Sequence, residues 1–215
     1  EQEGPILVDQ SFTQQCLDEM NITHTVKEHP LEMLARIGVK PEDVRHVILS
    51  HLHWDHYAGD TFYPNARYYV HQQEIEYVTG PLMRFHTYSQ HYNFKAIENL
   101  LHMQFSGRVE LLQGDSEPLC DGITCIRMGG HTPGLLSIAI ETGRNTKIIC
   151  SDVIPRYQNI SEMTPCGIHY NVTEALMALE KIKSIAKSTA NILPGHDPEI
   201  TARYPQTTPG VYRVS

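Results

Sequence analysis

Three histidines and an aspartate stand within six positions of the stretch VILSHLHWDHYAGD, residues 47–60. They are His51, His53, Asp55 and His56. Imidazole and carboxylate groups together suit zinc, and also manganese, iron or cobalt, without any thiolate. The two histidines that are two residues apart project to the same side of an extended loop, while a turn would direct Asp55 and His56 to an adjacent centre. The stretch therefore predicts metal ligands, and enough of them for two ions.

Three more ligand-type residues follow apolar stretches further along the chain. His131 follows GITCIRMGG, Asp152 follows TKIICS and His196 follows NILPG. Because each stands at the end of a predicted strand, these side chains and the first four are expected to meet at one edge of a sheet. Most histidines in proteins are ordinary hydrogen-bonded residues, and we keep that interpretation for His24, His29, His46, His71, His86, His91 and His102.

The composition is that of an ordinary globular protein with no basic character. The chain has 215 residues, a formal net charge of −8 and a pI near 5.9, which argues against nucleic acid as a partner and favours a small-molecule substrate. No apolar stretch approaches the ~20 residues that a membrane span needs. The start, EQEGPILVDQ, has neither an initiator Met nor a signal-peptide pattern. Five cysteines without paired short spacings favour a reducing compartment, so we predict a cytoplasmic protein.

The elements that would position these ligands are strands mixed with helices, which predicts a single α/β domain over residues 1–215. Helices are predicted at 30–38, which begins with Pro and ends with Gly, and at 171–187, where Asn171 and Glu174 form a cap pair. The apolar face of the second helix comprises Val172, Ala175, Leu176, Leu179, Ile182 and Ala186. Strands are predicted at GPILVDQ, RHVILS, ARYYVHQ, VELLQG, GITCIRMGG, LLSIAIETG, TKIICSD and ANILPG.

The segment 81–105 is rich in Met, Phe, Tyr and Leu. Its default interpretation is a pair of helices that cover the sheet. The functional alternative is a helical cover over the metal site, which would give an apolar wall for an acyl chain or a homodimer contact.

The motifs HLHWDH, GGHTPG, CSD and PGHD, in this order within residues 47–198, closely resemble those of the metallo-β-lactamase superfamily. The resemblance implies an αβ/βα sandwich with two divalent metal ions at one edge, Zn²⁺ first, with Mn, Fe or Co as alternatives. It also implies that this chain lacks the first N-terminal strands of the fold. Carried over by position, His51, His53 and His131 would hold one ion, Asp55, His56 and His196 the other, and Asp152 would bridge both.

Within the superfamily, the stretch SHLHWDHYAGDTFYPNARYYVHQQEIEY looks most like the N-acyl homoserine lactonase branch. This resemblance implies that a metal-bridging hydroxide opens a lactone or similar cyclic ester, with Asp55 as the proton shuttle. The lactonases carry a Tyr three residues beyond the bridging Asp, where this chain has Pro155. Tyr157 is the nearest candidate to hydrogen-bond the oxyanion, and His169, in the loop before the long helix, is a candidate substrate contact.

Two alternatives remain open from the sequence. Thioester hydrolases of the glyoxalase II kind use nearly the same ligands but typically add a helical domain after the last histidine, and here 19 residues follow His196 (215 − 196). A non-catalytic metal-binding protein on the same fold would be expected to have lost ligands, whereas all seven are present.

Overall fold

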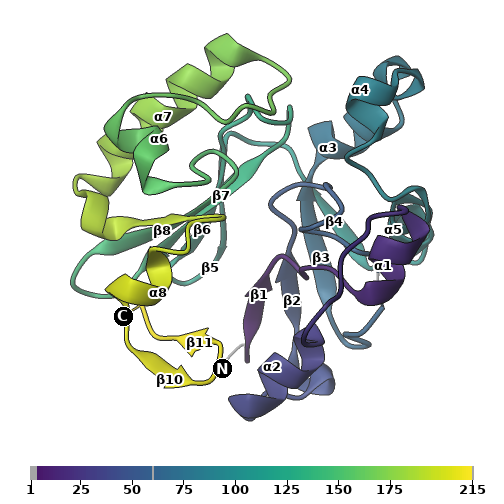
Figure 1. Cartoon of the computed structure of the whole chain (residues 1–215), viewed down its shortest axis with the longest axis horizontal. Helices are drawn as coiled ribbons and strands as arrows, with labels where there is room; N and C mark the ends of the chain where they lie inside the picture. The colour runs from purple at the N-terminus through teal and green to yellow at the C-terminus, as the bar shows by residue number, and fades with distance from the viewer. Residues whose placement is uncertain (1–3, 60, 215) are drawn as a thin grey trace. The chain divides into compact units, whose positions relative to one another are not determined.

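The computed structural model describes residues 4–59 and 61–214, and the chain divides into two compact units, Glu1–Leu111 and Leu112–Ser215. Each unit consists of a β-sheet with helices packed on it (Figure 1). Within the described part of the chain, no helix is both long enough and apolar enough to cross a membrane.

The first unit contains a four-stranded sheet in the order β1-β2-β3-β4. Strand β2 runs parallel to both β1 and β3, so the chain must cross back over the sheet between them. The strands are β1 (Ile6–Val8), β2 (His46–Ile48), β3 (Arg67–His71) and β4 (Val109–Leu112). The helices are α1 (Gln14–Glu19), α2 (Pro30–Arg36), α3 (Gln72–Val78), α4 (His86–Ser89) and α5 (Phe94–Phe105), with the 3₁₀ turns η1 (Pro41–Asp43) and η2 (Pro81–Arg84).

Helix α5 closes the core of the first unit. Asn93 caps its start by accepting hydrogen bonds from the backbone N–H groups of Lys95 and Ala96. Its buried residues, which include Ile97 and Leu100, recur at helical spacing and pack in one cluster with the strand residues Val47, Tyr68 and Val70. The expected helical covering of the sheet by segment 81–105 is thus provided by α5, while η2 and α4 precede it.

The second unit contains a mixed five-stranded sheet in the order β5-β6-β7-β8-β9. Its pairs are antiparallel except for β8 and β9, which are parallel. The strands are β5 (Ser116–Cys120), β6 (Ile123–Arg127), β7 (Leu136–Glu141), β8 (Thr146–Ser151) and β9 (Ile192–Pro194), with a separate pair, β10 (Gln206–Thr208) and β11 (Val211–Tyr212). The helices are α6 (Tyr157–Ser161), α7 (Val172–Ala186) and α8 (Ile200–Arg203), with the 3₁₀ turn η3 (Thr189–Asn191).

Helix α7 confirms the predicted helix, but the side of the helix that faces the core differs from the predicted one. Ala175, Ala178, Leu179, Ile182 and Ala186 are buried, whereas Val172 and Leu176 are 46% and 41% exposed. The reason lies at the start of the helix, where the backbone of Ala175 approaches Gly130 so closely that a Cβ on the glycine would lie 2.4 Å from the alanine Cα. Only small residues fit at this contact, and they fix which side of the helix faces the sheet.

Candidate metal centre

The first cluster of candidate ligands comprises His51, His53, Asp55 and His56, directly after strand β2. The ring of His51 lies 4.5 Å from that of His53 and 4.2 Å from that of His56, centroid to centroid. A tight turn folds the segment, because the backbone N–H of His56 donates to the carbonyl of His53 at 3.0 Å. Asp55 Oδ2 lies 3.6 Å from His56 Nε2. The turn gathers three imidazoles and a carboxylate, as the spacing predicts.

Asp9, which follows strand β1, orients two of these imidazoles, although it belongs to no sequence motif. Its Oδ2 accepts from His56 Nδ1 and from the Ser50 hydroxyl, both at 2.8 Å, and its Oδ1 accepts from the Ser50 backbone N–H at 2.7 Å. Since the Ser50 hydroxyl donates to Asp9, its oxygen accepts from His51 Nδ1 at 3.1 Å. Both rings therefore carry their proton on Nδ1 and would bind a metal through Nε2, as in carboxylate–histidine–metal arrangements.

His53 lies among aromatic rings. Its centroid is 4.8 Å from that of Tyr92 and 5.2 Å from that of His91. Burial lowers the pKa of His91 from its usual value, so this neighbour is neutral at physiological pH. A neutral neighbour adds no positive charge next to a residue that would bind a cation.

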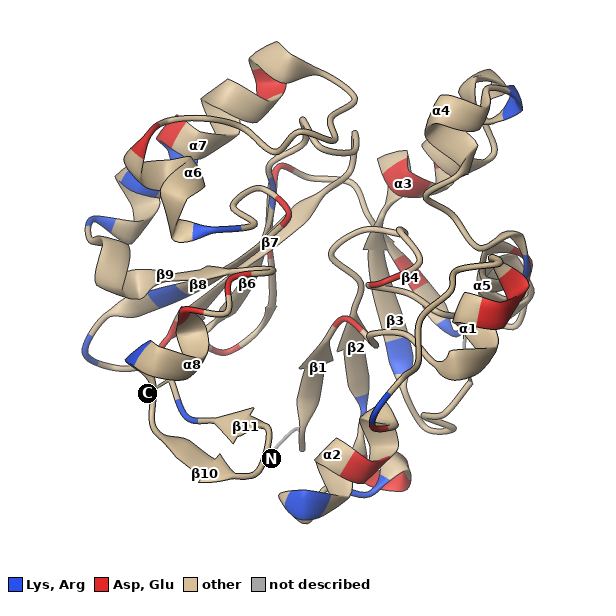
Figure 2. Ribbon diagram, in the orientation of Figure 1, with Lys and Arg blue, Asp and Glu red and all other residues tan. Residues whose placement is uncertain are grey.

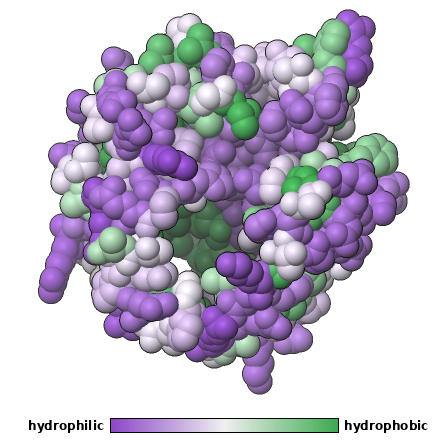
Figure 3. All heavy atoms as spheres, viewed as in Figure 1, coloured by the Kyte–Doolittle hydropathy of each residue, from purple (hydrophilic) through white to green (hydrophobic). Residues whose placement is uncertain are grey.

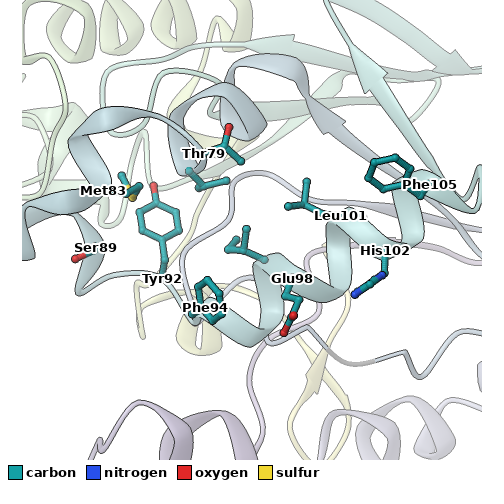
Figure 4. Close-up of a pocket in the computed structure, with 11 residues that line it drawn as sticks. Thr79, Met83, Ser89, Tyr92, Phe94, Glu98, Leu101, His102 and Phe105 are labelled. Atoms are coloured by element: carbon teal, nitrogen blue, oxygen red, sulfur yellow. The ribbon is translucent and has the colours of Figure 1, made fainter.

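Tyr92 also lines an apolar cavity of about 550 Å³ in the first unit (Figure 4). Its ring thus contacts a candidate metal ligand and also faces the cavity. Burial raises the pKa of the Tyr92 hydroxyl, which keeps it protonated. The cavity is lined by Val78, Thr79, Met83, Ser89, Tyr92, Phe94, Ile97, Glu98, Leu101, His102 and Phe105.

The second cluster comprises His131, Asp152 and His196, from three different strand ends of the second unit. The two oxygens of the Asp152 carboxylate face different imidazoles. Oδ2 lies 3.2 Å from His131 Nε2, and Oδ1 lies 2.9 Å from His196 Nε2. His131 and Asp152 are buried, at 4% and 8% exposure. Each oxygen of the carboxylate thus faces one imidazole.

Backbone contacts between the ends of β8 and β9 fix Asp152 and His196. Ser151 has a left-handed φ of +48°, a conformation that is sparsely populated outside glycine and often found at functional sites. Gly195 lies so close to this strand end that a Cβ on it would be 2.8 Å from the Ser151 carbonyl oxygen. The backbone N–H of His196 then donates to the carbonyl of Pro155 at 2.9 Å. The glycine of the PGHD motif is thus required by close packing.

His131 is oriented by the segment before α7. Its Nδ1 donates to the Ile168 carbonyl at 2.7 Å, so Nε2 is the nitrogen that would bind a metal. The preceding Gly130 has a φ of +86°, which a glycine adopts without strain. Its carbonyl accepts from the backbone N–H of Tyr170 at 2.8 Å.

Cys166 joins the second cluster, and the sequence did not single it out as a ligand. Its Sγ and the ligand atoms of His131 and Asp152 all lie within 4.8 Å of one another. Burial raises the pKa of the thiol. The signal in the sequence is weak, because a single cysteine in a loop matches no ligand spacing.

The two remaining predicted residues, Tyr157 and His169, also belong to the second unit. Tyr157 is 7% exposed and packs in the core, where its hydroxyl donates to the Ile192 carbonyl at 3.1 Å. Burial raises its pKa to about 12. The structure thus gives this hydroxyl a partner other than the predicted substrate oxyanion. His169 is exposed and its Nδ1 donates to the Cys166 carbonyl at 3.0 Å, and its contact with substrate stays a prediction.

Both clusters fit a divalent transition metal. The first supplies imidazoles held through Nδ1, and the second supplies a carboxylate with one oxygen for each of two imidazoles. Such borderline nitrogen and oxygen donors suit zinc and its neighbours.

The surface charge is mixed on both units. Lys and Arg positions are interspersed with Asp and Glu along the ribbon (Figure 2). The viewed face is largely hydrophilic, with several groups of apolar residues among the polar ones (Figure 3). That nucleic acid is not a partner, as the net charge of −8 indicates, stays a prediction.

Comparisons with known proteins agree with these clusters. A family model described as the metallo-beta-lactamase superfamily matches residues 19–196. An N-acyl homoserine lactonase of Bacillus cereus is 26% identical over 212 residues, which cover 92% of this chain and 78% of the relative.

The chain is also similar to solved structures of lactonases. A B. thuringiensis AiiA mutant with N-decanoyl-L-homoserine bound at the active site is 25% identical and superposes with a TM-score of 0.73, over 92% of this chain and 78% of that one. AidC, a dizinc quorum-quenching lactonase, has the same fold at 18% identity, with a TM-score of 0.71 over 92% of this chain and 70% of its own.

Proposed function

Because this chain belongs to the metallo-beta-lactamase superfamily and is a metal-dependent hydrolase, we propose that it opens a lactone or similar cyclic ester. Two observations carry the reaction class, each within one unit: the first unit has a histidine-rich turn, and the second has a carboxylate that faces two imidazoles. The observation that carries the substrate class is the similarity to N-acyl homoserine lactonases over 92% of the chain.

In this proposal the two clusters would act on one pair of ions. By the resemblance to the family, His51, His53 and His131 would hold one ion, Asp55, His56 and His196 would hold the other, and Asp152 would be shared by both. When bound, two such ions lower the pKa of a shared water and polarise the substrate carbonyl. Support for this assignment comes from the family, and from the Nδ1 hydrogen bonds that present Nε2 of His51, His56 and His131.

The protein residues contribute orientation and proton transfer. Asp9 keeps His51 and His56 in their tautomer, which is worth about 10- to 100-fold in metal affinity or activity for comparable outer partners. Asp55, half-buried beside His56, accepts a proton from the attacking water and passes it to the leaving alkoxide.

The apolar cavity of the first unit is the proposed place for a substrate tail. Its wall includes Tyr92, whose ring contacts His53, so the cavity begins one aromatic ring away from a metal ligand. Its volume of about 550 Å³ lies in the range of small-molecule pockets. Segment 81–105 would then act as the helical cover over the site.

A panel of γ- and δ-lactones, thioesters and β-lactams, assayed with the metal-replete protein, tests this proposal. We expect turnover of lactones, with binding improved by up to ~0.8 kcal/mol for each added CH₂ of an acyl tail until the cavity is full. Lactone turnover that is insensitive to tail length would contradict the cavity assignment alone. Brisk thioester hydrolysis without lactone opening would favour the glyoxalase II alternative instead.

A non-catalytic metal-binding protein on this fold makes a different prediction for the same samples. It would bind two ions and turn over no member of the panel. Elemental analysis of the assayed protein distinguishes it from a preparation that is inactive because it lacks metal.

A further inference from the structure

Cys166 lies where a metal ligand would lie, in the loop between α6 and α7. Its sulfur and the ligand atoms of His131 and Asp152 are all within 4.8 Å of one another, and all three residues belong to the second unit. We propose that Cys166 is a thiolate ligand of the ion that His131 and Asp152 hold. This inference rests on the metal centre of the proposed function and adds a ligand to it.

Hydrogen bonds on both sides fix the loop that carries this thiol. On one side, the Asn159 side chain donates to the Thr164 carbonyl at 3.0 Å. On the other side, the Ile168 carbonyl accepts from His131 Nδ1 at 2.7 Å. The loop that bears Cys166 is therefore attached directly to one of the two residues with which the thiol would share an ion.

Cys150, the preceding cysteine in the sequence, differs from Cys166 in its surroundings. Cys150 stands two positions before Asp152, but it is fully buried in strand β8, and its thiol lies 3.5 Å from the Ile148 carbonyl, back along the same strand. Proximity in sequence to the bridging residue thus does not place a thiol at the cluster, whereas the loop before α7 does.

Coordination by Cys166 is chemically simple. When the ion binds, the thiol S–H bond breaks, the proton goes to solvent and a sulfur–metal bond forms, with no change of oxidation state. A thiolate is a softer donor than imidazole or carboxylate, so it favours zinc or cobalt over manganese. The thiolate charge also offsets part of the charge of the two cations.

The test is cobalt substitution of the full-length protein. Co²⁺ should produce a near-ultraviolet thiolate-to-cobalt charge-transfer band, and Cys166→Ser should remove it. Cys120→Ser is the matched control, because Cys120 is also half-buried in the second unit but lies on strand β5, and it should keep the band. Cys166→Ser should weaken binding of one of the two ions by at least about 10-fold, the cost of losing even an outer-shell partner.

Thiol reactivity provides an independent readout. Bound Zn²⁺ should protect Cys166 from alkylation, as measured by mass spectrometry of the modified peptide, and leave Cys120 equally reactive with and without metal. Two bound cobalt ions without the charge-transfer band, or with a band that survives in Cys166→Ser, would overturn the thiolate assignment while leaving the metal centre intact. Failure to bind two ions at all would instead contradict the proposed function.

Discussion

The two ligand clusters are assembled by different means. The first lies in six consecutive positions, and a single turn after β2 gathers its rings. The second takes His131, Asp152 and His196 from three strand ends, and the pairing of β8 with β9 brings two of them together. Local sequence therefore determines the first cluster, whereas the sheet as a whole determines the second.

The difference predicts where each cluster is vulnerable. In the second, one side chain, Asp152, contacts both imidazoles, so its loss separates them. In the first, the ligands stay together by covalent connection, and the residue whose loss would disorder two rings, Asp9, is not itself a ligand.

The largest effect is expected for Asp152→Ala. Without the shared carboxylate the second cluster loses both its charge and its link between His131 and His196, so we expect loss of both ions and of all turnover above background. Asp152→Asn should be nearly as damaging, because an amide lacks the charge that offsets two dications. Elemental analysis and lactone turnover are measured together, with Asp121→Ala, at an exposed turn of the same unit, as the control. Retention of full metal content and rate would refute the bridging role.

A smaller effect is expected when Asp9, which orients two rings of the first cluster, is changed. Asp9 has a φ of +62°, which asparagine tolerates better than alanine, so Asp9→Asn changes the charge with little backbone strain. We expect a loss of about 10- to 100-fold in metal affinity or turnover, because His51 and His56 lose the carboxylate that fixes their tautomer. Metal titration of this variant is compared with that of Asp18→Asn, an exposed position in the same unit. Equal affinity in both would show that the turn alone orients the rings.

The contrast between local and long-range assembly also explains which features could be predicted from the sequence. Strands such as β2, β3 and β8 are rich in β-branched or aromatic residues and are predicted from pattern alone, as is α7 with its Asn171 cap. Strand β5 was not predicted, because SEPLC has a proline and alternating polar residues and lies at the sheet edge. The predicted ligands of each unit lie together, in the first unit because one turn gathers them and in the second because strand ends meet at a sheet edge. Asp9 and Cys166 could not be found in this way, because long-range contacts rather than spacing give them their positions.

The buried side of α7 could likewise not be predicted from local sequence. Periodicity predicts Val172 and Leu176 as core residues, yet both are exposed. The close approach of Ala175 to Gly130 sets the rotation of the helix, and this contact joins residues far apart in the chain. Helical periodicity identifies an apolar stripe, but tertiary packing decides which edge of the stripe is buried.

The smallest effect is expected for Tyr157→Phe, and it tests whether the second cluster extends to this residue. The hydroxyl donates to the carbonyl of Ile192, in the strand that leads to His196. Removing it leaves a carbonyl in the core without this donor, so we expect the free energy of unfolding to fall by about 1 kcal/mol, measured by urea denaturation. Metal content and lactone turnover should stay within about twofold of the parent, since the hydroxyl donates to a backbone carbonyl. A hydroxyl that instead hydrogen-bonds the substrate oxyanion would give the opposite pattern: unchanged stability with turnover slowed by ~10- to 1,000-fold. Because the two roles move different measurements, a single variant separates a tyrosine that supports the strand behind a ligand from one that takes part in the reaction.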